Sequence, residues 1–199
     1  CDQIFAEVAE KTGTHNLKTD LGLLISSPNA HVVYHLDMPM VMLWQIRGVK
    51  KVYLYPADAG FFTDRQIEGI ALRESDENLP YDTAFDDKAL IHDLKPGEML
   101  TWPQNAPHRI ENGPMLNVSL SIEFMTPPAV MRANVLYANG VLRKAGLRPR
   151  LQAAPHPGAL AKIALARGVK ATGMSKTFQK NLASTFKVDL ASPNAIAPL

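Results

Sequence analysis

The sequence predicts a mainly β protein, an antiparallel sandwich or barrel, followed by a helical extension at its C-terminal end. Eight short runs of apolar, β-branched or aromatic residues are separated by Pro, Gly and Asn, which is typical of antiparallel β folds. Residues 117–124 alternate strictly between polar and apolar side chains, as a half-buried strand does. After Pro127 and Pro128, apolar residues recur at helical spacing instead.

The expected elements follow in chain order. Residues 3–11 are predicted to form a short helix. The strands expected after it are Leu23–Ser26, His31–Leu36, Val41–Ile46, Lys51–Tyr55, Ala89–His92, Glu98–Trp102, His108–Glu111 and Leu116–Phe124. In the last strand the apolar side chains share one face, and in a ligand-holding barrel we expect the polar face to line the interior.

Between the fourth and fifth strands, residues 57–88 form an acidic and irregular connection, with a short helix expected near residues 64–72. Connections of this length in a compact domain are usually lids, binding loops or disordered segments. We expect this one to lie over the mouth of the barrel.

The pair Pro127-Pro128 marks the predicted boundary between a barrel domain, residues 1–128, and a basic helical extension, residues 129–199. A second helix is expected at Pro157–Arg167, and residues 190–199 are expected to be frayed.

The composition limits the classes of protein to which the chain can belong. With 199 residues, 46% of them hydrophobic, it can bury one good core and a small appendage. Its single cysteine, Cys1, excludes an intramolecular disulfide and thiolate-only metal sites, which suits a cytoplasmic protein. No apolar run approaches the ~20 residues that cross a bilayer, and residues 1–7 do not resemble a signal peptide, so no membrane partner is expected. Because the chain begins at Cys1 and not at Met, we expect upstream residues that could complete the barrel.

Charge is distributed unevenly along the chain. Residues 1–128 hold 10 Lys and Arg against 18 Asp and Glu, a net charge of −8, whereas residues 129–199 hold 11 Lys and Arg against Asp189, a net charge of +10. A basic segment can attract nucleic acid, anionic lipid or an acidic partner, but its simplest use is to pack on the acidic domain and neutralise it. The extension has no helix-turn-helix pattern and few aromatic residues, so nucleic acid is not an expected partner.

Two imidazoles and a carboxylate predict a metal site. Residues two apart on a strand point to the same face, so His35 and Asp37 can hold one ion together while His108 approaches from a neighbouring strand. Such a set occupies one face of an octahedral ion and leaves the other positions open for a co-substrate and dioxygen. The residue types therefore favour a non-haem Fe(II) oxygenase. Arg109, next to His108, is expected to point away from the metal.

The residues around His108 resemble the second motif of the cupin family. That motif has Gly, Pro, His and Asn at fixed spacings, and the matching residues are Gly97, Pro103, His108 and Asn112. The glycine that the family usually has between the Pro and the His is Asn105, the residue next most tolerant of a left-handed backbone.

The first cupin motif is matched with two departures. Where the family has His-x-His, this chain has His35-Leu36-Asp37, and the Glu of the family motif is Val41. These changes convert a closed site into an open facial triad. The combination resembles the JmjC-type branch of the family, whose members are Fe(II)- and 2-oxoglutarate-dependent oxygenases. The resemblance covers residues 23–126 and implies a double-stranded β-helix, the jelly-roll barrel of the cupins.

The segment from Gln45 to Pro56 resembles the strand pair that follows the His-x-Asp motif in asparaginyl-hydroxylase-like JmjC proteins. The resemblance implies that Lys50 binds the distal carboxylate of 2-oxoglutarate. Lys50 also shares a strand face with Val52 and Leu54, where a lysine must find an anion or lower its pKa. The alternative is that Lys50 lies at the strand end and reaches water.

Two further residues are candidates for lining the co-substrate site: Ser119, on the polar face of the last strand, and Tyr34, beside the triad. The asparaginyl-hydroxylase-like relatives also place an Asn at the position of Val41 to contact the co-substrate, so their site is only partly reproduced.

The function that the resemblance implies is an Fe(II)- and 2-oxoglutarate-dependent dioxygenase that hydroxylates a protein side chain or a small metabolite. No catalytic residue beyond the metal ligands is expected. The acidic connection favours a basic or polar substrate. The alternative is a metal-binding cupin without turnover, which acts as a sensor or transcriptional regulator through its basic helices. A homodimer through residues 129–170 is expected.

Overall fold

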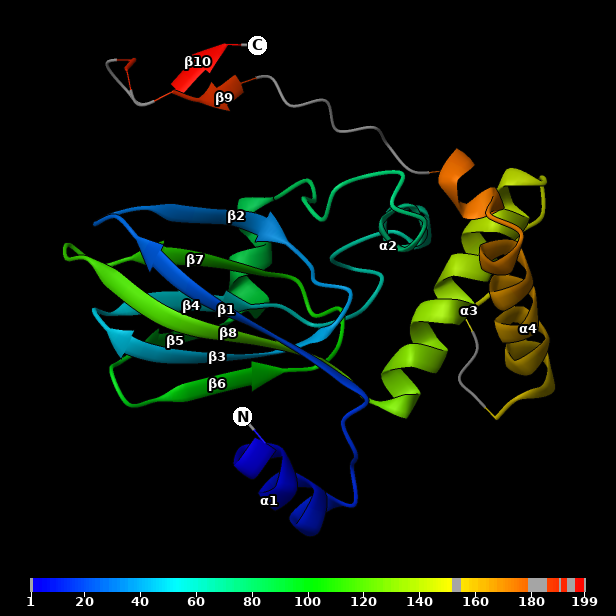
Figure 1. Cartoon of the computed structure of the whole chain (residues 1–199), viewed down its shortest axis with the longest axis horizontal. Coiled ribbons are helices and arrows are strands. Elements are labelled where there is room, and N and C mark those ends of the chain that lie inside the picture. Colours follow the sequence, from blue (N-terminus) through cyan, green and yellow to red (C-terminus); the bar gives the residue numbers. More distant parts are fainter. Residues whose placement is uncertain (1, 152–154, 179–185, 190, 193–195, 199) are drawn as a thin grey trace.

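The computed structural model describes residues 2–151, 155–178, 186–189, 191–192 and 196–198, and Figure 1 shows its elements. The helices are α1 (Asp2–Thr12), α2 (Asp64–Ala71), α3 (Pro127–Lys144) and α4 (Pro157–Ala171), with the 3-10 helices η1 (Thr83–Lys88) and η2 (Met174–Thr177). The strands are β1 (Lys18–Ser26), β2 (His31–His35), β3 (Met40–Arg47), β4 (Lys50–Leu54), β5 (Leu90–Leu94), β6 (Met99–Trp102), β7 (His108–Asn112), β8 (Asn117–Met125), β9 (Phe186–Val188) and β10 (Ile196–Pro198).

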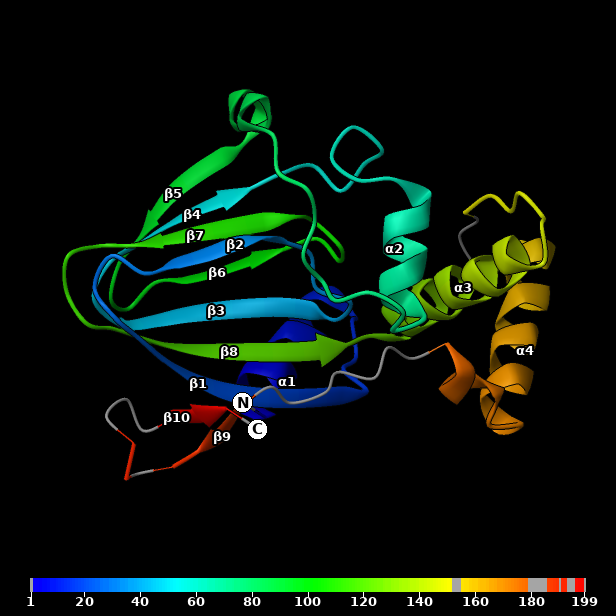
Figure 2. The same cartoon turned by 90° about the horizontal axis from the view of Figure 1, so that it is seen from above.

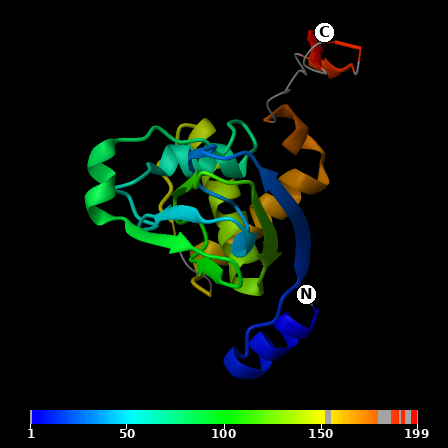
Figure 3. The same cartoon turned by 90° about the vertical axis from the view of Figure 1, so that its left-hand side faces the viewer.

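The strands β1 to β8 form two four-stranded antiparallel sheets that lie face to face (Figure 2). One sheet has the order β1-β8-β3-β6 and the other the order β2-β7-β4-β5. Strands that follow each other in the chain therefore lie mostly in opposite sheets, and Figure 3 looks along them. This strand order is that of a double-stranded β-helix, and it confirms the predicted antiparallel sandwich.

The largest difference from the predicted strands is at β1. The sequence predicts this strand from Leu23, whereas it begins at Lys18, because Lys18–Ser26 pairs with β8 over the whole length of that strand. β1 is an edge strand, and polar side chains at its start interrupt the apolar pattern from which strands are recognised.

The interior of the barrel is partly apolar and partly polar. Its apolar part consists of Val41, Leu43, Val52, Leu54, Leu94, Trp102, Ala106 and Ile110. β8 turns its polar face inward, where the fully buried Ser119 donates a hydrogen bond to Oε1 of Gln45 at 2.6 Å. Its apolar face points outward, and Phe124 packs there on Phe5 of α1 with ring centroids 5.3 Å apart. The expected orientation of this strand is thus the observed one.

The acidic connection, residues 57–88, packs on the β2-β7-β4-β5 sheet and against α3. A second core forms between them and comprises Tyr34, Leu36, Tyr53, Tyr55, Phe61, Ile67, Ile70, Leu79 and Leu136. The connection also extends the edge of β2, because the Leu36 N–H donates to the Glu77 carbonyl at 3.2 Å. The helix predicted near residues 64–72 is α2. The segment that we expected over the barrel mouth therefore mainly covers the barrel wall.

α3 packs against both α2 and α4 (Figure 2). Among the described residues, three ion pairs join α3 to the acidic connection, the longest of them between Arg143 Nη2 and Oδ2 of Asp64 at 3.9 Å. Arg143 binds Glu68 through two nitrogens, with Nη2 3.0 Å from Oε1, and Lys144 Nζ lies 2.7 Å from Oε1 of Glu74. These basic residues neutralise part of the acidic segment, which is the simplest of the uses expected for them.

Among the described helices, none combines the length and the apolar character needed to cross a bilayer. β9 and β10 form a separate antiparallel pair near the C-terminal end. Of the tail that we expected to be frayed, residues 190–199, only 191–192 and 196–198 belong to the described part of the chain.

Candidate metal centre

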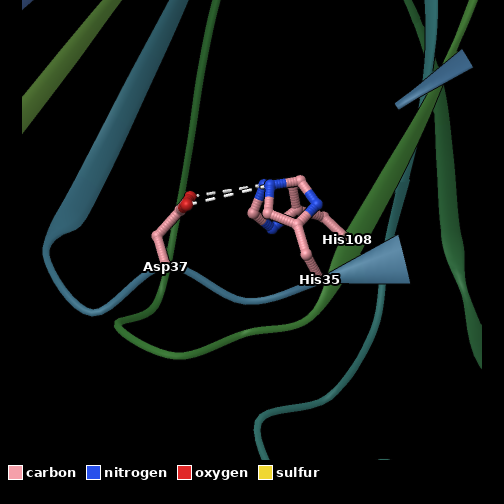
Figure 4. Close-up of side chains that lie close together, drawn as sticks. All are labelled: His35, Asp37 and His108. Atoms are coloured by element: carbon pink, nitrogen blue, oxygen red, sulfur yellow. Dashed lines mark ion pairs between the residues drawn. The ribbon is translucent and has the colours of Figure 1, made fainter. Parts of the chain in front are cut away.

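His35, Asp37 and His108 come together at one end of the barrel (Figure 4). His35 ends β2, His108 begins β7, and the two are register partners in their sheet. Asp37 follows β2 by two residues. Two imidazole nitrogens and one carboxylate oxygen of these residues lie within 4.8 Å of one another. Nε2 of His35 is 3.7 Å from Oδ1 of Asp37, and Nε2 of His108 is 3.3 Å from Oδ2.

Backbone carbonyls decide which ring nitrogens are free to bind a metal. Nδ1 of His35 lies 2.8 Å from the carbonyl oxygen of Val33, and Nδ1 of His108 lies 3.1 Å from that of Ala106. Because a carbonyl oxygen only accepts, each Nδ1 carries a proton and donates it. Each Nε2 of a neutral ring is then left with a lone pair, and both face the Asp37 carboxylate. Imidazoles that bind metals are oriented in this way.

Burial shifts the pKa values of both His108 and Asp37. Burial, reinforced by the nearby His35, lowers the pKa of His108 to about 3, so this ring is neutral at pH 7. Burial also raises the pKa of Asp37 to about 6, which His35 opposes and which Glu77 and Glu123 reinforce. The short distance between His108 and Asp37 is therefore not an ion pair. A divalent cation would supply the charge that this donor set lacks, so the residues fit a metal.

Lys50 lies in the interior of the same barrel. In the register of β4 with β7, Lys50 is opposite Asn112 and Leu54 is opposite His108. The side chains of Lys50 and His108 therefore project from the same face of the sheet. Lys50 is 2% exposed, and burial lowers the pKa of its ammonium, an effect that no carboxylate of the described residues opposes.

The other two candidates for the co-substrate site are placed differently from each other. Ser119 lies in the interior, but its hydroxyl already donates a hydrogen bond to Gln45. Tyr34 belongs to the second core, where its hydroxyl donates to the carbonyl of Phe61 at 3.0 Å. Neighbours on a strand point to opposite faces, so a residue next to His35 faces away from the metal ligands. For the same reason Arg109 points outward, as expected, and its guanidinium lies 3.4 Å from the ring centroid of Tyr53.

Two carboxylates near Asp37 were missed by the sequence analysis. Glu77 comes from the acidic connection and Glu123 from β8, and both raise the pKa of Asp37. Together with Met38 and Pro39, which directly follow Asp37, they line a cavity of about 940 Å³. The signal that could have found Glu123 is the alternation of β8, because Glu123 shares the parity of Ser119.

No known protein family and no curated protein matches the sequence. Among solved structures, the chain is similar to the cupin domain of Drosophila melanogaster CENP-C, with 13% identity and a TM-score of 0.35, over 52% of this chain and 55% of that one. It is also similar to a cupin superfamily protein of Desulfitobacterium hafniense DCB-2, with 13% identity and a TM-score of 0.34, over 56% and 75% of the two chains. A third similar structure is a variant of oxalate decarboxylase from Bacillus subtilis, with 14% identity and a TM-score of 0.37, over 53% of this chain and 21% of that one. The chain thus spans little more than half the length of the CENP-C domain that it matches.

Proposed function

We propose that the chain is an Fe(II)- and 2-oxoglutarate-dependent dioxygenase of the cytoplasm, which hydroxylates a C–H bond of a protein side chain or a small metabolite. The observation that carries the proposal is Lys50, a lysine buried in the same barrel as an open His-Asp-His set. Within the described part of the chain, no carboxylate compensates its ammonium. An uncompensated buried ammonium is costly, which favours a bound anion as its partner.

The three ligands would hold Fe(II) through Nε2 of His35, Nε2 of His108 and a carboxylate oxygen of Asp37. Three protein donors leave about three positions of an octahedral ion open, enough for a bidentate 2-oxo acid and dioxygen. When bound, Fe(II) and 2-oxoglutarate would activate dioxygen, the oxidant of the reaction: one oxygen atom would enter the substrate C–H bond and the other would enter succinate, with release of CO2. The chain itself orients the donors and keeps water from the buried His108 through its apolar neighbours, such as Trp102, whose ring centroid lies 4.6 Å from that of His108.

From the strand register we infer that a dicarboxylate can bridge Lys50 and the metal ligands. Lys50 lies four positions before Leu54, the partner of His108, which corresponds to about 13 Å along β4. An extended lysine side chain covers roughly half of this distance. A 2-oxo acid chelated at the metal would cover the remainder and place its distal carboxylate against the ammonium.

The substrate is proposed to bind in the cavity beside Asp37. Its volume of about 940 Å³ is in the range of small-molecule sites. Glu77 and Glu123 line the wall next to the metal ligands, as their effect on the pKa of Asp37 indicates. Lys18, Arg73 and Lys170 also line the cavity, so the preference applies to the part beside Glu77 and Glu123. Carboxylates there favour a cationic group, such as the side chain of a lysine or arginine in a peptide or the amine of a metabolite.

An anaerobic titration of the Fe(II)-loaded protein with 2-oxoglutarate tests the proposal. The chelated co-substrate gives a weak visible charge-transfer band, which we expect to saturate in the wild type and to be absent in His108→Ala. We expect Lys50→Met to weaken the apparent affinity for 2-oxoglutarate by about tenfold or more, since it removes a charge-assisted contact. Lys51→Met is the matched control, because Lys51 is the exposed neighbour on the opposite strand face.

Fe(II) binding without the band would contradict the dioxygenase and favour the metal-binding cupin without turnover, a sensor or regulator. Wild-type protein that binds no metal would contradict both. An equal loss of affinity in Lys50→Met and Lys51→Met would show that the effect is not specific to the buried lysine.

A further inference from the structure

The turn formed by Pro103–Ala106 supports two of the three metal ligands. The turn is closed by the Ala106 N–H, which donates to the Pro103 carbonyl at 3.0 Å. The Ala106 carbonyl in turn accepts from Nδ1 of His108 at 3.1 Å. From the same turn, Nδ2 of Asn105 donates to the backbone carbonyl of Asp37 at 3.0 Å. One turn of the chain thus holds both the ring of His108 and the main chain of Asp37.

The backbone alone does not explain an asparagine at position 105. Its φ is +65°, in the left-handed region that the third residue of a type II turn requires. Glycine, which the cupin motif usually has here, adopts this conformation without strain. What asparagine adds is a side chain, and this side chain is 1% exposed and hydrogen-bonded at both ends.

Arg132 of α3 determines the orientation of the Asn105 amide. Its Nε lies 2.9 Å from Oδ1 of Asn105. Because a guanidinium can only donate, the amide oxygen must face Arg132 and the amide nitrogen must face Asp37. Arg132 is half-buried and forms no ion pair with a carboxylate of the described residues. No such carboxylate therefore competes with Asn105 for its guanidinium.

Gln104 makes a parallel connection. Its Nε2 donates to the carbonyl of Met38 at 2.9 Å and to that of Ala129, in α3, at 3.2 Å. The loop that carries Asp37 is therefore tied to this turn, and the turn is tied to α3, by side-chain amides at two successive positions.

We propose that Asn105, oriented by Arg132, is a positioning residue for the metal ligand Asp37. The inference rests on the metal site of the proposed function and adds that α3 takes part in it. A fixed Asp37 carbonyl limits the directions in which the carboxylate of the same residue can point relative to His35 and His108. Outer groups that orient a ligand typically change metal affinity by about 10–100-fold.

The test measures the affinity of the full chain for Mn(II) by calorimetry in Asn105→Gly. Glycine keeps the left-handed backbone and removes only the side chain, so the turn is expected to survive. We expect a loss of Mn(II) affinity of about 10–100-fold. Asn29→Gly is the matched control, because Asn29 is an exposed asparagine with φ +56° in the connection before β2, and it should leave the affinity unchanged.

Two further variants separate positioning from folding. Asn105→Asp retains an oxygen for Arg132 and replaces the donor that faces Asp37 with an acceptor, so it should lose as much affinity as Asn105→Gly. Arg132→Met should lose less than Asn105→Gly, and it should cause no additional loss in the Asn105→Gly background, because residues of one chain of contacts are not additive. The visible spectrum of bound Co(II) should change in Asn105→Gly, which a merely structural role would not produce.

If the wild type binds Mn(II), and Asn105→Gly has the same Mn(II) affinity and the same Co(II) spectrum as the wild type, this inference is overturned and the proposed function stays intact. Additive losses in the double variant would overturn the role of Arg132. Wild-type protein without Mn(II) affinity would overturn the proposed function and this inference together.

Discussion

Nε2 of His108 lies 3.3 Å from Oδ2 of Asp37, and both atoms are acceptors. The proton of the neutral ring is on Nδ1, where the Ala106 carbonyl accepts it, so a lone pair faces the carboxylate. Two acceptors in a buried place repel each other until a cation or a proton lies between them. The metal-free protein therefore contains a locally unfavourable contact that a divalent ion would relieve.

We accordingly expect Mn(II) to stabilise the fold. At a free concentration of one hundred times its Kd, a ligand that binds only the folded state adds about 2.7 kcal/mol. For a chain of this size, that corresponds to an increase in Tm of about 5–10 °C, which scanning calorimetry can measure. The chelator EDTA should reverse the increase. A Tm that is unchanged by Mn(II) would contradict a metal site at these residues.

Asp37→Asn should have opposite effects on the metal-free and metal-loaded proteins. An asparagine amide can donate to the free Nε2 of His108, so a neutral hydrogen bond replaces the contact between two acceptors, and the metal-free variant should gain about 1 kcal/mol. The increase in Tm with Mn(II) should be lost, because the anionic ligand is gone. Thermal melts with and without metal check both effects, and a destabilised metal-free variant would refute this reading of the contact.

Lys50→Met should stabilise the protein while weakening co-substrate binding. Replacing an uncompensated buried ammonium with an apolar side chain should add about 1 kcal/mol, or about 2–4 °C in Tm, at pH 7. Because burial lowers the pKa of Lys50 in the folded state, the unfolded state binds more protons, and wild-type stability rises with pH between the lowered value and about 10.4. The advantage of the variant should therefore shrink as the pH approaches 10, and urea unfolding at several pH values measures it. An advantage that does not depend on pH would contradict the burial of a charged lysine.

Arg143 should matter far more to stability than its neighbour Lys144. Arg143 pairs with Glu68, whose side chain is only 3% exposed, so Arg143→Met would leave a buried carboxylate without its partner and should cost about 3 kcal/mol. Lys144 pairs with Glu74, which is 49% exposed, and Lys144→Met should cost less than about 1 kcal/mol. Urea unfolding measures the loss in free energy of unfolding for the two variants. Equal losses would contradict the expectation that burial makes the Arg143–Glu68 pair more important than the exposed Lys144–Glu74 pair.

Gly48→Ala and Gly97→Ala should separate backbone strain from steric conflict. Both glycines have a positive φ, +78° and +91°, so either alanine is expected to cost about 1 kcal/mol through its backbone. A Cβ at Gly48 would also lie 2.5 Å from Oδ1 of Asn117, whereas a Cβ at Gly97 would meet no atom within 4 Å. Gly48→Ala should therefore unfold at a clearly lower urea concentration than Gly97→Ala. Similar midpoints would mean that the Asn117 side chain moves aside at little cost.

Much of this protein could be predicted from local periodicity. The alternation of side chains along a strand places Lys50 on the face of Leu54 and Ser119 on the polar face of β8, because consecutive residues of a strand point to opposite faces whatever the rest of the chain does. Asp37 lies two residues beyond the end of β2, so its position beside His35 follows from the loop after that strand. The same alternation rule would have assigned Tyr34, the strand neighbour of His35, to the face that points away from the metal ligands.

Tertiary structure alone decided which distant residues surround the ligands. The acidic connection brings Glu77 to Asp37, and α3 brings Arg132 to Asn105, although 40 and 27 positions separate the members of these pairs in the chain. Neither contact has a local signal, since an exposed-looking Glu and a helical Arg are common in any sequence. Their positions follow from how the second core and the helices pack on the barrel, and packing is a property of the whole chain because each buried surface needs a partner from elsewhere in the sequence.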